Sequence, residues 1–348
     1  MNRASPVKQS THEPPEQSLL PQPYVKPALL ELRCVEKRFP VKSGFWSSSK
    51  QFVHAVDGVS FSIVRGETLA LVGESGCGKS TVGRSILRLF ELSGGEVRLD
   101  GERIDHLSDS KLRPLRKRIQ VIFQDPFSSL NPRLKVKEII AEPIRNFSLA
   151  RSESDLDQRV ADLLEKVRLP RDAASRWPHE FSGGQRQRIG IARALAAEPD
   201  LIICDEAVSA LDVSVKAQIV NLLQDLQREL GMALLFISHD LAIVQHMTHR
   251  VAVMYLGRIV EIADRKTLFE RPLHPYTEAL LSAVPVPDPK KKAKRIVLQG
   301  DVPSPIERPD GCHFHTRCPI VQDHCRKESP VLTKQGDGRW LACHFRGE

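Results

Sequence analysis

The nine residues GESGCGKST, from Gly73 to Thr81, constrain the fold of this chain more than any other feature. They fit the pattern G-x-x-x-x-G-K-[ST], follow the apolar run TLALV and precede the helix-forming stretch STVGRSILRLF. Glycines let backbone N–H groups curl around phosphate oxygens, and the positive end of a helix dipole adds to the attraction. The full motif in this context disfavours a plain Gly-rich turn. It predicts a phosphate-binding loop between a buried strand and a helix, with nucleotide contacts from Gly73, Glu74, Ser75, Gly76, Cys77, Gly78, Lys79, Ser80 and Thr81.

Two carboxylates complete the chemistry that such a loop needs. In the loop itself, Lys79 would neutralise the β- and γ-phosphates, and the Ser80 hydroxyl would bind Mg²⁺. The run LIICDE places Asp205 and Glu206 at the end of a short apolar strand. We expect Asp205 to hold Mg²⁺ through water and Glu206 to polarise the attacking water as general base. The alternative, a surface pair of carboxylates, is disfavoured downstream of a matched phosphate-binding loop.

The apolar runs predict an α/β fold with a largely parallel sheet. Strands are expected at the runs that begin at residues 29, 54, 67, 201, 233 and 251. A helix is expected from Val213 to Leu230, with Asp212 as its N-cap and one apolar face formed by Val215, Ile219, Leu222, Leu223, Leu226 and Leu230. Residues 126–181 contain no strong strand and predict a helical subdomain, whose clearest helix is expected at residues 154–169.

A second anion-binding pattern precedes the acidic strand. In EFSGGQRQRIGIARAL, the residues Ser182, Gly183, Gly184 and Gln185 would open a helix with exposed N–H groups. One chain cannot bring this pattern and its own phosphate-binding loop to the same phosphate if they lie on separate lobes facing the same way. Two chains packed head to tail can, so each nucleotide would lie between the loop of one subunit and the pattern of the other.

With this pattern, the sequence resembles the ABC-type ATPases from about Leu29 to Ala263. The resemblance implies that Gln124 contacts Mg²⁺ and the attacking water, and that His239 holds the γ-phosphate and orients Glu206. It also implies that residues 209–212, ending in Asp212, form the D-loop, and that Phe39 stacks on adenine. Two positions depart from the common pattern: Phe39 stands where the family often has Tyr, and Phe181 stands where Leu is common.

Composition and spacing separate the function classes that share this ATPase. No apolar run approaches the roughly 18 residues needed to span a membrane, so a transporter of this kind would use separate membrane subunits. The ATPases that act on DNA carry a long heptad insert, which the 81–181 segment lacks. Translation-type relatives usually carry two cassettes, whereas this chain has one of each motif. The net charge of +8 favours anionic partners, but no nucleic-acid-binding motif accompanies it.

Beyond the ATPase, residues 255–285 and 299–319 closely resemble the C-terminal extension of dipeptide and oligopeptide importer ATPases. The early part resembles their F-type subunit, which implies a heterodimer with a D-type subunit, two membrane permease subunits and an extracytoplasmic binding protein. The solute stays open, since related importers carry dipeptides, oligopeptides, glutathione, nickel chelates or sugars. We therefore expect a disordered leader at 1–28 without a secretory signal, an ABC ATPase domain at 29–264 and an extension at 265–348, on the cytoplasmic face of the bacterial inner membrane.

Four cysteines in the extension have the spacing C-x5-C-x6-C-x17-C, at Cys312, Cys318, Cys325 and Cys343. Disulfides are disfavoured in the cytosol. Zinc usually takes C-x2–4-C spacing, although His313, His315, His324 and His344 could join a zinc shell. Four thiolates on longer loops suit a [4Fe–4S] cluster, and some tails of peptide-importer ATPases bind one. Cluster, zinc and coincidence remain open. Cys34, Cys77 and Cys204 are expected to be structural.

Overall fold

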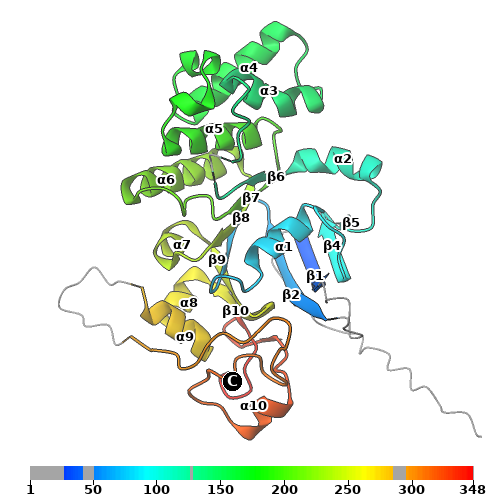
Figure 1. The fold of residues 1–348 in the computed structure, drawn as a ribbon, viewed down its shortest axis with the longest axis vertical. Helices are drawn as coiled ribbons and strands as arrows, with labels where there is room; N and C mark the ends of the chain where they lie inside the picture. The colour runs from blue at the N-terminus through cyan, green and yellow to red at the C-terminus, as the bar shows by residue number, and fades with distance from the viewer. Residues whose placement is uncertain (1–26, 42–50, 126–127, 285–294, 348) are drawn as a thin grey trace, which may run out of the picture.

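The computed structural model describes residues 27–41, 51–125, 128–284 and 295–347. Residues 1–26 of the expected leader lie outside these residues, whereas Ala28, its last residue, already begins the first strand. The polar segment 43–50, expected to be a loop, and nearly all of the Pro- and Lys-rich segment after Val284, expected to be a linker, also lie outside them. Figure 1 shows a helical region at one end of the long axis, two sheets in the middle and the C-terminal extension at the other end.

The central sheet carries the parallel strands that the sequence predicts. Its strand order is β11-β12-β10-β9-β3-β8-β7-β6, where β11 is Thr333–Lys334 and β12 is Trp340–Leu341. The pairs β3–β8, β3–β9, β7–β8 and β6–β7 are parallel, while β10 returns antiparallel beside β9. These strands are buried and strongly apolar because helices or the other sheet cover them. Their bounds are β3 Thr68–Val72, β6 Ile119–Ile122, β7 Leu201–Asp205, β8 Ala233–Ser238, β9 Arg250–Tyr255 and β10 Arg258–Asp264.

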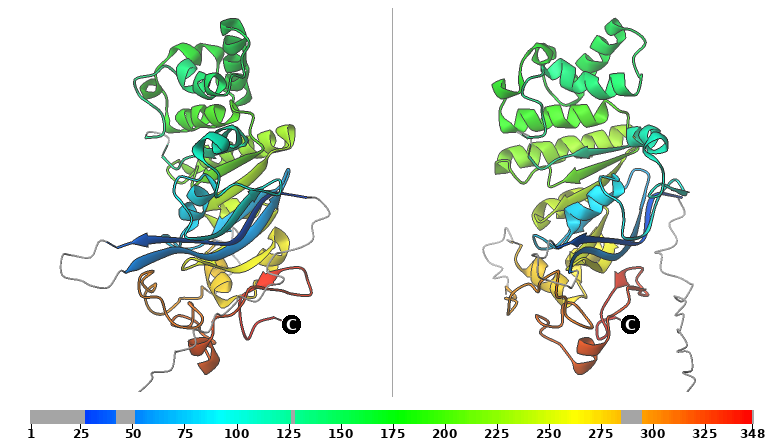
Figure 2. Two further views of the ribbon diagram at one scale, coloured as in Figure 1. Left: turned by 90° about the vertical axis from the view of Figure 1, so that its right-hand side faces the viewer. Right: turned by 45° about the vertical axis from the view of Figure 1, so that its right-hand side comes forward.

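An antiparallel sheet with the order β2-β1-β4-β5 forms the second layer (Figure 2). Its strands are β1 Ala28–Pro40, β2 Phe52–Val64, β4 Gly94–Leu99 and β5 Glu102–Arg103. Their inward apolar side chains share one core with α1 (Lys79–Ile86) and with residues of the central sheet. The expectation that Cys34 is a structural core residue is wrong, because its side chain is exposed. The β1–β2 register shifts between Leu32 and Val35, and Cys34 has φ +46°, so this irregularity turns the thiol outward.

Helices cover the central sheet and form the predicted helical region. They are α2 Asp109–Arg118, α3 Val136–Asn146, α4 Glu153–Lys166, α5 Gly183–Leu195, α6 Val213–Leu230 and α7 Leu241–Met247, with short 3₁₀ turns at Arg171–Ser175 and Pro178–Glu180. Helix α4 matches the helix expected at 154–169 within three residues, and α6 matches its expected range. Asp212 occupies the N-cap of α6 without a side-chain capping bond. Leu230 is 45% exposed, so its expected place on the apolar face is wrong: it lies in the last turn, before Gly231 ends the helix.

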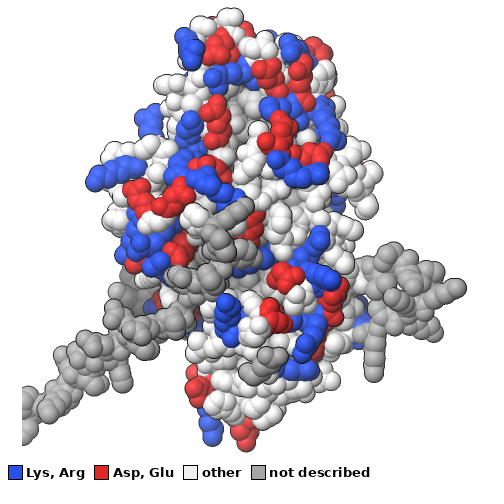
Figure 3. Space-filling model, turned by 180° about the vertical axis from the view of Figure 1, so that it is seen from behind, with Lys and Arg blue, Asp and Glu red and all other residues white. Residues whose placement is uncertain are grey.

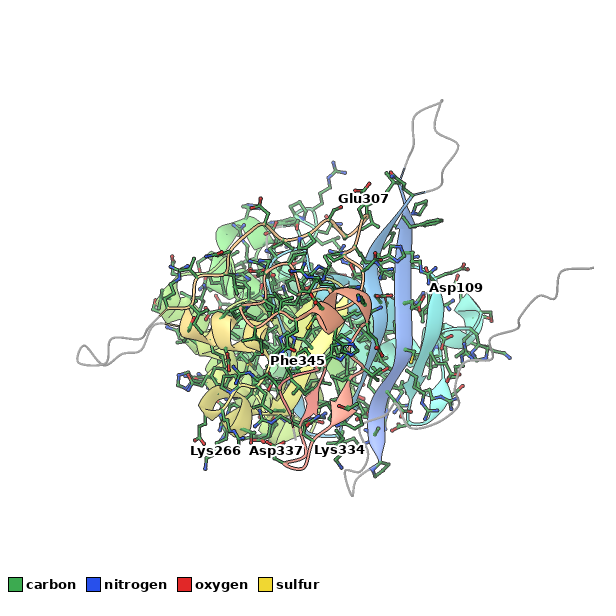
Figure 4. The ribbon with its side chains drawn as sticks, turned by 90° about the horizontal axis from the view of Figure 1, so that it is seen from below. Asp109, Lys266, Glu307, Lys334, Asp337 and Phe345 are labelled. Carbon is green, nitrogen blue, oxygen red and sulfur yellow. The ribbon has the colours of Figure 1, made fainter. Side chains whose placement is uncertain are left out.

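The C-terminal extension joins the central sheet directly. It contains α8 Arg265–Glu270, α9 Pro275–Ser282, α10 Asp323–Lys327, β11 Thr333–Lys334 and β12 Trp340–Leu341. Strand β12 pairs with β10 through Glu261↔Leu341 and Ile262↔Trp340. Seen from below, the extension lies beside the antiparallel sheet, whose strands are seen lengthwise, with Glu307 toward one end of these strands and Lys334 and Asp337 toward the opposite side (Figure 4).

A buried ion pair fixes this attachment. The Arg339 guanidinium lies 3.1 Å from the Glu261 carboxylate, and the two side chains are 1% and 0% exposed. Glu261 also accepts the N–H groups of Leu273 and His274, and Arg339 also donates to the carbonyl of Arg271. Each charge therefore has several partners, which is the condition under which a buried ion pair is tolerated.

The surface carries charges of both signs. Figure 3 shows Lys and Arg interspersed with Asp and Glu over the visible face, so the net charge of +8 does not gather there into one basic patch. Within the described residues, no helix has the length and apolar character needed to cross a membrane.

Candidate active site

Four parallel strands deliver the predicted site residues to one edge of the central sheet. The phosphate-binding loop follows β3, His239 follows β8, Asp205 ends β7 with Glu206 directly after it, and Gln124 comes just after β6. Because carboxyl ends of parallel strands lie on the same side, these four segments become neighbours although they span nearly half of the chain, from Gly73 to His239. The register agrees, since Val72 is opposite Ser238 and Asp205 is opposite Ile237.

Two glycines of the loop are required by close backbone approaches. A Cβ atom on Gly73 would lie 2.2 Å from the Met254 carbonyl oxygen, and one on Gly78 would lie 2.0 Å from that of Ala55. Both residues also have positive φ, which L side chains rarely adopt. Any side chain at either position would therefore displace the loop from the strands behind it.

The loop holds its lysine internally. Lys79 is 4% exposed, and its ammonium donates to the carbonyl oxygens of Gly73 at 2.8 Å and Glu74 at 2.9 Å. These are neutral acceptors, whereas phosphate oxygens carry charge and form stronger bonds with an ammonium group. The loop is thus folded around a cation that an anionic ligand can engage.

The next residue links the loop to the acidic strand. The Ser80 hydroxyl donates to the Asp205 carboxylate at 2.6 Å, and Asp205 is buried. A hydroxyl and a carboxylate side by side are hard oxygen ligands of the kind that Mg²⁺ prefers, and they suit an ion that also binds phosphate oxygens. The donor set therefore fits the Mg²⁺ that the sequence predicts.

Glu206 and His239 meet at the same edge. The Nδ1 atom of His239 lies 3.4 Å from the Glu206 carboxylate. Glu206 has φ +50°, and its backbone is fixed because its N–H donates to Ile237 and its carbonyl accepts from the N–H and hydroxyl of Ser209. A non-glycine residue in this conformation is uncommon, and such backbone strain clusters at functional sites.

Gln124 lies exposed just after β6, next along the edge from the acidic strand. Its neighbour Phe123 accepts a hydrogen bond from Gln187 of α5 at 3.5 Å. The glutamine segment is thereby connected to the helix that carries the second anion-binding pattern.

That pattern lies at the start of α5, as the sequence predicts. The Ser182 hydroxyl accepts the N–H of Gln185, and the Gln185 side chain accepts the N–H of Ser182. Gly184 packs closely on α6, since a Cβ atom there would lie 2.5 Å from Val215. Figures 1 and 2 show α5 with α3 and α4, away from the loop that precedes α1, so one chain does not bring its two patterns together.

Phe39 contacts a second aromatic ring. Its ring packs edge-on against Phe90 at 5.3 Å between centroids, and the Lys37 ammonium lies 4.8 Å from its centre. The predicted contact with adenine stays a prediction, for which a partly exposed ring that is braced by neighbours is suitable.

The core thiols differ from those of the extension. Cys204 is fully buried, and burial raises its pKa to about 12. Cys77 is also buried, which raises its pKa although the Lys79 ammonium lies beside it. Both are therefore protonated at neutral pH and unreactive, in agreement with the structural role expected for them.

The four cysteines of the extension lie in one small region. Burial first, and then the neighbouring thiols of Cys325, Cys343 and Cys318, raise the pKa of Cys312 to about 11. The Cys312 N–H donates to the Cys325 carbonyl, and Gly311 packs so closely on Cys325 that a Cβ would lie 2.4 Å from that oxygen. All four are free thiols.

The described side chains around these thiols are not arranged to bind a single metal ion. In the described part of the chain, no group of three or more His, Cys, Asp or Glu side chains is arranged to hold a metal ion. The nearby histidines contact backbone carbonyls instead, His313 that of Leu256, His315 that of Cys312 and His344 that of Glu328. A zinc site built from these residues therefore has no support in the geometry.

Two residues that sequence reasoning missed contact the phosphate-binding loop. Tyr276 and Arg317 both bind Glu74, from positions more than 200 residues later in the chain. No motif marks either residue, because the contact depends on how the extension folds back on the sheet.

Comparison with known proteins gives two family matches: "ABC transporter" over residues 56–209 and "Oligopeptide/dipeptide transporter, C-terminal region" over residues 260–325. The chain is 55% identical to a probable peptide ABC transporter ATP-binding protein of Sinorhizobium fredii, over 92% of this chain and 90% of that protein. It is 51% identical to the oligopeptide transport ATP-binding protein AppF of Bacillus subtilis, over 91% and 97% of the two chains.

Solved structures agree with these matches. The structure of cbiO1 from Clostridium perfringens, part of an ABC transporter complex, has a TM-score of 0.61 at 28% identity and covers 71% of this chain and 92% of that one. An ATP-binding cassette solved as a dimer with ADP and phosphate has a TM-score of 0.60 at 29% identity, covering 68% and 98%.

Proposed function

This chain belongs to the family of ATP-binding subunits of peptide ABC transporters, and from that membership we propose that it hydrolyses ATP to power the import of dipeptides or oligopeptides. The observation that carries the proposal is the hydrogen bond from Ser80 to Asp205, because it joins the phosphate-binding loop to the acidic strand where a nucleotide–Mg²⁺ complex would bind. The extension matched to peptide transporters supports peptides over glutathione, nickel chelates or sugars as the solute.

The residues at the sheet edge divide the chemistry among them. Lys79 would exchange its loop carbonyls for β- and γ-phosphate oxygens. Ser80, Asp205 and Gln124 would hold Mg²⁺, which supplies charge neutralisation on the phosphates when bound. Glu206 would accept the proton of the attacking water, and His239 would contact the γ-phosphate while it orients Glu206.

The second anion-binding pattern would serve the nucleotide of a partner subunit. Its separation from the loop of the same chain supports a head-to-tail dimer, in which Ser182 and Gly183 approach the partner's ATP. The resemblance to F-type subunits favours a D-type subunit as that partner, with Asp212 and the rest of the D-loop at the interface. Val213, just beyond it, is 84% exposed and available for such a contact.

The conformational changes that accompany ATP binding and hydrolysis would be transmitted to membrane permease subunits, with this subunit on the cytoplasmic face of the inner membrane. Gln124 and the helical region at 128–181 are suited to this role, because the hydrogen bond between Phe123 and Gln187 links the site to α5. ATP binding would close the dimer, and hydrolysis would reopen it. A binding protein outside the membrane would supply the peptide.

Peptide uptake by cells tests the proposal. We expect cells that carry Lys79→Met in place of the wild-type subunit to lose uptake of labelled di- and oligopeptides, and the purified variant to lose ATP binding. Lys166→Met is the matched control, because Lys166 lies at the surface and pairs only with the exposed Glu229 among the described residues. Unchanged uptake of every peptide tested, with an expressed variant, would rule out peptide import by this subunit.

We also propose that Cys312, Cys318, Cys325 and Cys343 hold a [4Fe–4S] cluster. Four free thiols gathered in a small region support it, and a cluster is larger than one ion, so the lack of a single-ion site is compatible with it. A bound cluster would supply a cross-link between loops that have little regular structure of their own.

Metal analysis on anaerobically purified protein tests this site. We expect about four iron atoms and a matching amount of acid-labile sulfide per chain, and a brown protein solution that absorbs visible light. Cys318→Ser should lose most of the iron, whereas Cys34→Ser, at an exposed cysteine of β1, should keep it. Stoichiometric zinc without colour, or no metal at all, would disprove the cluster.

A further inference from the structure

The extension holds the second residue of the phosphate-binding loop at two points. The Tyr276 hydroxyl of α9 accepts the N–H of Glu74 at 2.8 Å. The Arg317 guanidinium donates to both carboxylate oxygens of Glu74, at 2.8 and 3.2 Å. Both the backbone and the side chain of Glu74 are therefore fixed from outside the ATPase core.

Arg317 is itself held in place. Its side chain is only 8% exposed, and its guanidinium carbon lies 6.0 Å from the centre of the Tyr255 ring. Tyr255, Tyr276 and Phe314 pack on one another with centroids 4.7 to 5.5 Å apart. The bidentate contact between Arg317 and the Glu74 carboxylate is largely buried and is supported by these rings. It therefore fixes the orientation of the carboxylate as well as its distance from Arg317, which an exposed ion pair does not.

The part of the loop that the extension holds is also the part whose carbonyl groups bind the Lys79 ammonium. Lys79 donates to the carbonyls of Gly73 and Glu74, and Glu74 is the residue that Arg317 and Tyr276 grip. If Glu74 were free, the loop would gain conformations that ATP binding must then select against, and affinity would fall.

We propose that Arg317 is a positioning residue that holds the phosphate-binding loop in its ATP-receptive shape, so that the C-terminal extension sets the affinity of this subunit for ATP. The inference rests on the proposed ATPase function and adds to it a control point outside the ATPase motifs. Arg317 acts through Glu74 and is not among the residues expected to contact the nucleotide.

Titration with a fluorescent ATP analogue on the full-length subunit tests the role. We expect Arg317→Ala to weaken binding about tenfold. In the assembled transporter, the KM for ATP should rise similarly, while kcat changes less than about twofold, because the water-activating residues are untouched. Arg317→Lys keeps the positive charge but loses the second hydrogen bond to Glu74, so its affinity for ATP should lie between those of Arg317→Ala and the wild type.

Arg308→Ala is the matched control. Arg308 also anchors the extension, but on Asp57 of β2 instead of the loop, so its loss should leave ATP affinity within about twofold. Glu74→Gln, nearly isosteric, tests the same contact from the other side and covers the case in which Arg317→Ala does not fold. The double variant Glu74→Gln/Arg317→Ala should bind no more weakly than the weaker single variant.

Unchanged affinity in Arg317→Ala and Glu74→Gln would overturn the inference, as would an equal loss in Arg308→Ala, which would indicate general loosening of the extension. These outcomes are separable from failure of the proposed function. If the wild-type protein bound no ATP, the function itself would be wrong; if it bound ATP and the variants matched it, only the role of Arg317 would be.

Discussion

Glu206→Gln is expected to lower the turnover of ATP in the assembled transporter by a factor of roughly 10²–10⁴ while ATP binding is retained. Glutamine has the same shape, so it can keep the 3.4 Å contact to His239 and the backbone bonds to Ile237 and Ser209. What it lacks is a basic oxygen that can accept the proton of the attacking water. The loss should therefore appear in kcat, with little change in nucleotide affinity.

The measurement is phosphate release at saturating ATP, together with equilibrium binding of the fluorescent analogue. Glu198→Gln is a suitable control, because Glu198 also has positive φ but makes only surface ion pairs with Lys117 and Arg159 among the described residues. A Glu206→Gln protein with the wild-type rate would show that another group activates the water.

Arg339→Met should reduce the free energy of unfolding by about 3–5 kcal/mol, because it leaves the fully buried Glu261 carboxylate without its cation. The two backbone N–H groups of Leu273 and His274 remain as donors but do not neutralise the charge. Since Trp340 is buried directly beside Arg339, its fluorescence reports the detachment of the extension during urea denaturation.

Two further variants sharpen this test. Arg339→Met combined with Glu261→Gln should recover a large part of the loss, because the amide oxygen still accepts a backbone N–H and no charge is left buried. Arg168→Met removes an exposed pair with Asp225 and should cost less than about 1 kcal/mol. Equal effects of Arg339→Met and Arg168→Met would mean that water reaches Glu261.

The sequence predicts the sheet edge well because each part of it is local. A short apolar strand followed by a fixed motif places Ser80, Asp205 and His239, and the rule for parallel strands brings their segments together. The hydrogen bond between Ser80 and Asp205 is the kind of contact that this reasoning anticipates. The same holds for α6, whose apolar spacing gives its bounds.

Contacts with no local pattern escape such reasoning. Arg317 and Glu74 are 243 positions apart, and nothing in the spacing of either indicates the pairing. The Arg339–Glu261 pair is hidden for the same reason, since an arginine in a short polar stretch resembles any exposed arginine. Cys34 and Leu230 fail differently: a strand irregularity and a helix end turn apolar side chains outward where regular periodicity predicts burial.

Strand β12 makes completion of the central sheet depend on the end of the chain. During synthesis, β10 is finished at Asp264, but its outer neighbour emerges only when Trp340 and Leu341 have been made. Until then its outer edge offers unpaired N–H and C=O groups to strands of other nascent chains, which is how aggregation begins. Premature termination within the extension would therefore yield an ATPase core with an open edge, prone to aggregate and to be recognised by chaperones.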